Sequence, residues 1–88
     1  MNVRYKKQFL RDLNNLPEQI KKKIQTIVFE RIPEAATLQE VNGLKKLKSH
    51  EHYFRLRHAE YRIGISVKND QILFCRVLHR KDIYKYFP

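Results

Sequence analysis

The stretch from Tyr53 to Val67, YFRLRHAEYRIGISV, constrains the fold of this chain more than any other segment. Side chains alternate between the two faces of a β-strand, and a two-residue turn at Ala59 and Glu60 folds such a stretch into a hairpin. The predicted cross-strand pairs are His58 with Tyr61, Arg57 with Arg62, Leu56 with Ile63, Arg55 with Gly64 and Phe54 with Ile65. The register of two strands is therefore predicted residue by residue.

The two faces of this predicted hairpin differ in chemistry. One face is apolar and consists of Phe54, Leu56, Ile63, Ile65 and Val67, whereas the other carries Tyr53, Arg55, Arg57, Arg62, Gly64 and Ser66. Like charges directly across from each other, as Arg57 and Arg62 are here, cost up to ~1 kcal/mol. A local rule broken inside an otherwise consistent segment points to function. We therefore expect a core beneath one face and an anion on the other.

Charge and composition favour a polyanionic partner. The 88 residues include 19 Lys and Arg against 9 Asp and Glu, and residues 43–88 alone carry a net charge of +7. A field of this size attracts nucleic acid. The single cysteine, Cys75, allows no intrachain disulfide, and no apolar run approaches the ~18 residues that span a bilayer. The start MNVRYKKQFL lacks a signal-peptide core. We expect a cytoplasmic protein without a membrane partner.

The remaining segments predict an α+β fold. Residues 2–5 are expected to form a strand, and Phe9, Leu10 and Leu13 recur at helix spacing up to Asn14. A second helix is expected from Pro17 to Pro33, with the apolar stripe Ile20, Ile24, Ile27, Val28 and Ile32. We predict one domain over residues 1–88, in which two N-terminal helices pack on one face of a small, mostly antiparallel sheet.

The second half of the chain supplies the other strands. A connector with one helical turn is expected over residues 33–43, an extended lead-in over 44–48 and a turn over 68–71. The last strand, 72–78, is apolar on both faces and is therefore expected in the middle of the sheet. Strict alternation places Arg76 on its core face, which requires either a bulge or a sheet that extends past its helices.

Arginines and tyrosines are the candidate functional residues. Arg55, Arg57 and Arg62 share a face, and Arg80 follows the last strand; planar guanidinium groups match phosphate oxygens and stabilise charge at a phosphoryl centre. Tyr53, Tyr61, Tyr84 and Tyr86 offer surfaces for unstacked bases. Gly64 is expected to leave the middle of the face open, so that a nucleic-acid backbone can approach.

Carboxylates are scarce near these arginines, so we expect neither a metal nor a cofactor. RNA then supplies its own nucleophile, the 2′-hydroxyl, and the reaction needs an acid and a base. His79 ranks first among the four histidines as that base, because it directly precedes Arg80. Tyr84 is expected to stack on a base or to share proton transfer, or else to act as a hydrophobic plug over the sheet.

Residues 44–63, LKKLKSHEHYFRLRHAEYRI, and 77–84, VLHRKDIY, following a strand and a helical hairpin, resemble the RelE/ParE superfamily of prokaryotic toxins. The resemblance implies a ribosome-dependent mRNA interferase, which cuts mRNA in the ribosomal A site by 2′-hydroxyl attack, and a small cognate antitoxin as partner. The ParE branch shares the fold but inhibits DNA gyrase. A non-catalytic RNA-binding module is the third alternative.

The resemblance also implies residue roles. Arg62 matches the transition-state arginine, Arg80 the arginine after the last strand, and Arg55 the position of a catalytic lysine in RelE. Arginine, with a pKa above ~12, is a poor base, so the base stays open. Either Tyr84 or Tyr86 matches the C-terminal tyrosine. The expected RNA-binding residues are Arg57, Lys45, Lys46, Lys48, Tyr53 and Tyr86, with the lysines holding rRNA.

Overall fold

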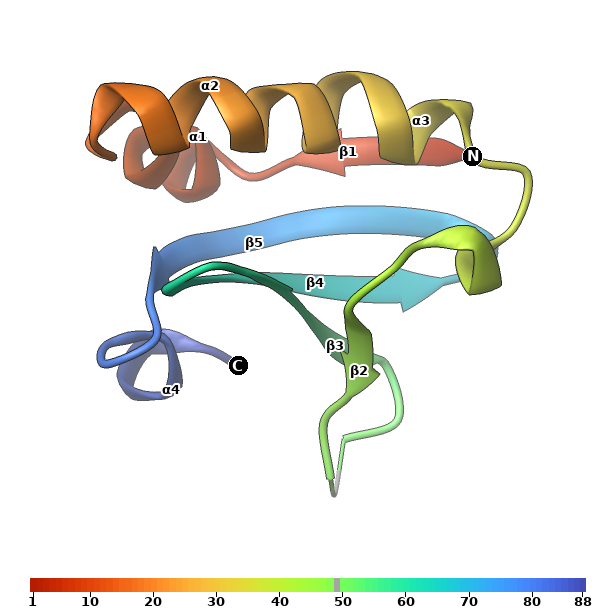
Figure 1. The fold of residues 1–88 in the computed structure, drawn as a ribbon. Coiled ribbons are helices and arrows are strands. Elements are labelled where there is room, and N and C mark those ends of the chain that lie inside the picture. The colour runs from red at the N-terminus through yellow and green to blue at the C-terminus, as the bar shows by residue number, and fades with distance from the viewer. Residues whose placement is uncertain (49) are drawn as a thin grey trace.

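The computed structural model describes residues 1–48 and 50–88, which form a five-stranded sheet with helices on both faces (Figure 1). The strands lie in the order β1-β5-β4-β3-β2, with β1 parallel to β5 and the other neighbours antiparallel. The predicted α+β class is confirmed. Within the described ranges, no helix has the length and apolar character needed to cross a bilayer.

The elements are β1 (Asn2–Tyr5), α1 (Lys7–Asn14), α2 (Glu18–Thr26), the π-helical η1 (Ile27–Arg31), α3 (Ile32–Glu34), the 3-10 helix η2 (Leu38–Glu40), β2 (Leu44–Lys46), β3 (Tyr53–His58), β4 (Tyr61–Lys68), β5 (Gln71–His79) and α4 (Ile83–Tyr86).

The hairpin of β3 and β4 has the register that its sequence predicts. All five expected pairs are present, including Arg57 opposite Arg62. The next turn is also confirmed, since Asn69 and Asp70 adopt φ angles of 50° and 61° between β4 and β5. Asn and Asp tolerate this left-handed region, which two-residue hairpin turns require. The local sequence is therefore sufficient to define three consecutive antiparallel strands.

The helices α1, α2 and α3 cover one face of the sheet and bury the main core (Figure 1). Of the three apolar residues expected on the first helix, Phe9 and Leu13 are buried, whereas Leu10 remains exposed. The second helical run passes through Pro33 and ends at Glu34, slightly beyond the predicted stop. Pro33 lies in the first turn of α3, directly after the π-helical η1, and a proline is tolerated at the start of a helix. The core residues are Phe9, Leu13, Ile24, Val28, Ile32, Leu56, Ile63, Ile65, Ile72, Phe74 and Val77.

A β-bulge in β5 explains the unexpected position of Arg76. Gly64 pairs with Arg76 and Ile65 pairs with Phe74, so that Cys75 is the extra residue on β5. An extra residue shifts the alternation by one position. Arg76 therefore leaves the core face on which strict alternation had placed it and lies in register with Gly64, as the bulge hypothesis anticipated. Phe74 and Val77 on either side still point into the core.

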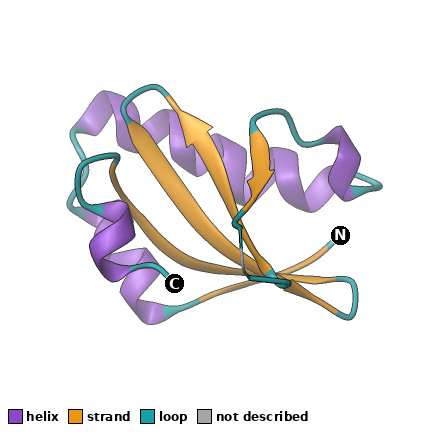
Figure 2. Cartoon of the chain, turned by 90° about the horizontal axis from the view of Figure 1, so that it is seen from below, coloured by secondary structure: helices purple, strands orange, loops and turns teal. Residues whose placement is uncertain are grey.

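The opposite face of the sheet carries a second, smaller core beneath α4, made of Cys75, Ile83 and Phe87 (Figure 2). A Cβ atom built on Gly64 would lie 2.6 Å from the ring of Phe87, closer than real side chains approach. The expectation that Gly64 leaves this face open is therefore wrong, because the missing side chain makes room for Phe87. Burial in this cluster raises the pKa of the Cys75 thiol.

We predict that Gly64→Ala destabilises the protein by forcing Phe87 out of its position, at a cost typical of overpacking, ~1–3 kcal/mol. Phe87→Ala should cost ~3–5 kcal/mol by itself. In the Phe87→Ala background, the further change of Gly64 to Ala should cost little, because the ring it would meet is gone. Urea unfolding of the four proteins measures this coupling. Equal costs of Gly64→Ala in both backgrounds would contradict the contact.

Candidate functional site

The sheet register gathers basic residues in two rows on the α4 face. Residues directly opposite each other on neighbouring strands share a face, and such strands lie ~4.8 Å apart. One row consists of Lys45, Arg55, Gly64 and Arg76, and the other of Arg57, Arg62 and Leu78. We call Arg55, Arg57, Arg62 and Arg80 the arginine cluster. Three of its members thus come from two adjacent rows of one hairpin.

Arg62 is the member most affected by the others. Partial burial lowers the pKa of its guanidinium, and the positive charges of Arg55, Arg57 and Arg80 lower it further, while Tyr84 acts in the opposite direction. These four side chains therefore interact electrostatically with the guanidinium of Arg62 and change its pKa. Nη1 of Arg62 donates to the carbonyl oxygens of Ala59 and Tyr61, at 2.9 Å each. These bonds hold the guanidinium against the hairpin turn.

Arg80 joins the cluster through the hairpin turn. Its backbone N–H donates to the carbonyl oxygen of Glu60 at 2.8 Å, and its Nε lies 2.7 Å from the Glu60 carboxylate. The backbone bond fixes where the chain leaves β5. Both side chains are more than half exposed, and such ion pairs contribute only ~0–1 kcal/mol. An anion with better geometry can therefore displace Glu60 from Arg80.

The two exposed tyrosines of α4 have different neighbours. Tyr84 raises the pKa of Arg62 electrostatically, whereas the centre of the Tyr86 ring lies 5.2 Å from Cζ of Arg76. Of these two candidates for the C-terminal tyrosine, Tyr84 is therefore the one that affects the pKa of Arg62. The alternative in which Tyr84 plugs the sheet is wrong: Ile83 and Phe87 are the buried residues of this segment, and Tyr84 is 58% exposed.

His79 directly precedes Arg80 in the chain, but its side chain lies on the helix-facing side of the sheet and not on the arginine face. It is the last residue of β5, one beyond the predicted strand end, and it pairs with Tyr61. The two rings meet edge to face at 5.4 Å, on the side of the sheet that Ile63 and Val77 share. Its Nδ1 accepts a hydrogen bond from the backbone N–H of Lys81 at 3.1 Å. Alternation along β5 separates His79 from Arg62.

The predicted RNA-binding residues divide between the two faces. Lys45 lies opposite Arg55 on the arginine face, whereas Lys46 lies opposite Phe54 on the helix-facing side. Lys48 is exposed beyond the end of β2. Tyr53 is half-buried and packs edge to face on Phe87, with ring centroids 5.5 Å apart. Of the three lysines, the register thus brings Lys45 into a row with the cluster.

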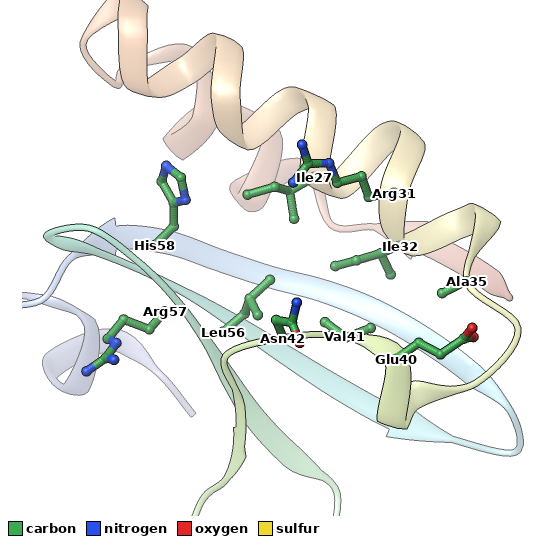
Figure 3. Close-up of a pocket in the computed structure, with 10 residues that line it drawn as sticks. All are labelled: Ile27, Arg31, Ile32, Ala35, Glu40, Val41, Asn42, Leu56, Arg57 and His58. Atoms are coloured by element: carbon green, nitrogen blue, oxygen red, sulfur yellow. The ribbon is translucent and has the colours of Figure 1, made fainter.

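A cavity of about 290 Å³ lies on the other side of β3, between η1, α3 and the connector (Figure 3). Its lining combines apolar residues such as Ile32 and Leu56 with polar ones at the rim. Figure 3 shows the side chain of His58 directed toward the helices, while that of Arg57 points to the opposite side of the strand. The cavity therefore opens on the side of β3 away from the Arg57 side chain, although Arg57 is among the residues that line it.

Sequence reasoning missed three residues that organise this region. Ile83 and Phe87 anchor α4, and their only sequence signal is the four-residue spacing of apolar side chains in a polar tail. Asp12 is buried on α1 although it is charged, and its position between Phe9 and Leu13 was a weak hint of this. In the described part of the chain, no three His, Cys, Asp or Glu side chains gather as metal ligands.

Comparisons with known proteins identify the family. Residues 3–84 match the family described as ParE toxin of type II toxin-antitoxin system, parDE. Toxin RelE3 of Methanocaldococcus jannaschii is 44% identical over 89 aligned residues, covering 100% of both chains. The crystal structure of a RelB-RelE antitoxin-toxin complex from Methanococcus jannaschii matches with a TM-score of 0.77 and 42% identity, covering 98% of this chain and 100% of that one.

A more distant structure supports the fold alone. The archaeal RelE-RelB complex from Pyrococcus horikoshii has a TM-score of 0.70 at 20% identity, covering 90% of this chain and 93% of that one. Together with the match over residues 3–84, these similarities show that the chain belongs to the RelE/ParE superfamily of toxins from type II toxin-antitoxin systems. The predicted resemblance is thereby confirmed.

We predict that Arg57→Gln stabilises the folded protein, because it removes the like charge directly opposite Arg62. The gain should reach up to ~1 kcal/mol at low ionic strength. It should shrink as salt is added, since salt screens exposed charges. Thermal melts at low and high salt measure both effects, with Lys22→Gln on the exposed side of α2 as the control. A variant no more stable than the wild type at low salt would show that repulsion is not significant here.

Proposed function

We propose that this protein is a ribosome-dependent mRNA endonuclease that acts in the cytoplasm and inhibits translation. The observation that carries the proposal is the arginine cluster with Tyr84 beside Arg62. Planar, weakly hydrated guanidinium groups bind phosphate oxygens through paired hydrogen bonds. The identity of 44% to a protein named Toxin RelE3 favours the RelE branch of the superfamily.

In the proposed reaction, the 2′-oxygen of one nucleotide attacks the adjacent phosphorus. The bond from phosphorus to the 5′-oxygen breaks, which leaves a 2′,3′-cyclic phosphate and a free 5′-hydroxyl. Arg62 and Arg80 stabilise the negative charge that develops on the phosphoryl oxygens, with Arg55 as a further contact. The 2′-hydroxyl loses a proton and the 5′-oxygen gains one. Tyr84 is the phenol placed to take part in this proton transfer.

The remaining basic residues have binding roles in this proposal. Arg57 and Lys45 contact phosphates next to the scissile one, because they share the arginine face. Tyr53 and Tyr86 flank this face and can each stack on an unpaired base. Lys46 and Lys48 lie outside the cluster and are assigned to rRNA. The ribosome supplies the mRNA in its A site.

We predict that Arg62→Ala abolishes most of the cleavage while leaving the protein folded. Loss of one charge-assisted contact at a phosphoryl centre is worth ~3–4 kcal/mol, or about 10²–10³ in rate. Arg80→Ala should behave alike. Primer extension on ribosome-bound mRNA measures cleavage, and thermal melts measure folding. Leu56→Ala serves as the contrasting variant, because truncation of this core residue costs ~2–5 kcal/mol and should remove activity by unfolding. Full cleavage by folded Arg62→Ala would refute the proposed site.

The same assay separates the two candidates for proton transfer. Tyr84→Phe should slow cleavage, since the ring stays and only the hydroxyl is lost. His79→Ala should cleave at nearly the wild-type rate, because His79 lies on the helix-facing side with Tyr61. The reverse result would return the role of base to His79.

We further propose that an antitoxin protein silences this toxin by covering the arginine cluster or its rim with an acidic or amphipathic segment. Support comes from the solved RelB-RelE complex, which is an antitoxin-toxin complex. We predict that expression of the toxin alone arrests growth and that co-expression of the adjacent small open reading frame restores it. The Arg62→Ala variant controls for toxicity unrelated to the cluster. Toxin expression without any growth arrest would contradict the proposal.

Inhibition of DNA gyrase is the second candidate function, because the matching family is described as ParE toxin. A DNA supercoiling assay run beside the primer extension distinguishes the two. Gyrase inhibition without mRNA cleavage would favour the second candidate. Binding to RNA without either activity would instead support the third alternative, a non-catalytic RNA-binding module.

A further inference from the structure

Asp12 is a buried carboxylate whose partners come from its own helix α1 and from β5. It is only 8% exposed, although it belongs to a surface helix. Its oxygens accept hydrogen bonds from Nε and Nη2 of Arg76 at 2.7 and 3.1 Å, and from the backbone N–H of Val77 at 3.2 Å. Gln8 adds a longer bond at 3.3 Å. Asp12 thus fixes both the bulged part of β5 and the guanidinium of Arg76.

Arg76 in turn contacts the C-terminal helix. Its Cζ lies 5.2 Å from the centre of the Tyr86 ring, within the range of a cation–π contact. Hydrogen bonding to Asp12 raises the pKa of Arg76, against the opposing effect of partial burial, and the charge of Asp12 adds to the increase. The guanidinium therefore connects α1, through the bulge, to α4. This connection spans 64 residues between Asp12 and Arg76.

Helix α4 needs such contacts, because an isolated helix of 4 residues is not stable in water. Phe87 and Ile83 hold it by apolar packing, and Tyr86 adds the contact with Arg76. Tyr84 lies two residues before Tyr86 on the same short helix, and it raises the pKa of Arg62 electrostatically. We propose that Asp12 and Arg76 are positioning residues that hold α4 against the sheet, so that Tyr84 stays beside the arginine cluster. The catalytic consequence rests on the proposed function, whereas the holding of α4 does not.

Cys75 provides a direct probe of this proposal. The thiol is only 4% exposed and is buried together with Ile83 and Phe87, so opening of α4 or unfolding of the whole protein should speed its reaction with a thiol reagent such as 5,5′-dithiobis(2-nitrobenzoate). The two routes differ in urea dependence, because local opening exposes little surface and global unfolding exposes much. The rate of labelling at low urea therefore reports on how firmly α4 is held.

Arg76→Met should raise the labelling rate about tenfold, the factor that corresponds to ~1.4 kcal/mol, with shallow urea dependence. Tyr86→Leu should do the same, whereas Tyr86→Phe, which keeps the ring, should label like the wild type. Lys85→Ala is the matched control. This variant removes a cation from the same helix. The ion pair of Lys85 with Asp82, at 3.7 Å, is exposed, so its loss should leave the labelling rate unchanged. Val28→Ala, in the main core, should speed labelling only through the steep, global route.

Two results would overturn the proposal. One is an Arg76→Met variant that labels at the wild-type rate. The other is faster labelling with only steep urea dependence, which would mean that the Asp12–Arg76 pair stabilises the whole fold and not α4. Asp12→Asn serves as the second variant, because it weakens the same pair from the α1 side while keeping an acceptor for Val77.

Cleavage kinetics test the functional consequence separately. Arg76→Met should lower the maximal rate of ribosome-dependent cleavage while changing the half-saturating toxin concentration little, because the arginine cluster itself is intact. A variant that labels faster but cleaves at the wild-type maximal rate would refute the positioning of Tyr84. If the wild-type protein does not cleave at all, the proposed function fails, and the labelling rates still decide whether Asp12 and Arg76 hold α4.

Discussion

The two faces of the sheet impose different requirements, and the packing of Phe87 on Gly64 reconciles them. One face is mainly apolar and is covered by α1, α2 and α3. The other carries arginines that must stay accessible to solvent or an anion, yet β4 and β5 also need cover there. A ring placed where a residue has no side chain covers the centre of this face and leaves its cationic edge open. The position of α4, and hence of Tyr84, depends on this contact.

The arginines on that face fall into two groups, which differ in whether a buried carboxylate neutralises their charge. Arg76 is neutralised by a buried carboxylate and serves as a structural contact between α1 and α4. Among the residues that the structure describes, the ion pair of the arginine cluster is the exposed one between Arg80 and Glu60, and Arg57 remains opposite Arg62. The folded protein therefore keeps unrelieved repulsion at one place, where the cluster, Tyr84 and the hairpin turn meet. A phosphate group would relieve it.

Family membership and activity rest on different observations. The match over residues 3–84 and the TM-score of 0.77 establish a RelE/ParE toxin, but proteins with one fold can act on different targets. The proposed cleavage of mRNA rests on the arginines and Tyr84. The position of His79 matters for the same reason, because one step along a strand moves a side chain to the other face and out of the site.

The sequence by itself determined the register of β3 and β4, the turn at Asn69 and Asp70, and the face shared by Arg55, Arg57 and Arg62. These features follow from a period of two residues and from short-range turn chemistry, which are local properties of the chain. Only the tertiary structure decided between a bulge and an extended sheet at Arg76, and only it revealed the packing of Phe87 on Gly64 and the pairing of Asp12 with Arg76. Each of these depends on contacts between segments far apart in sequence, and no local pattern specifies which segments will meet.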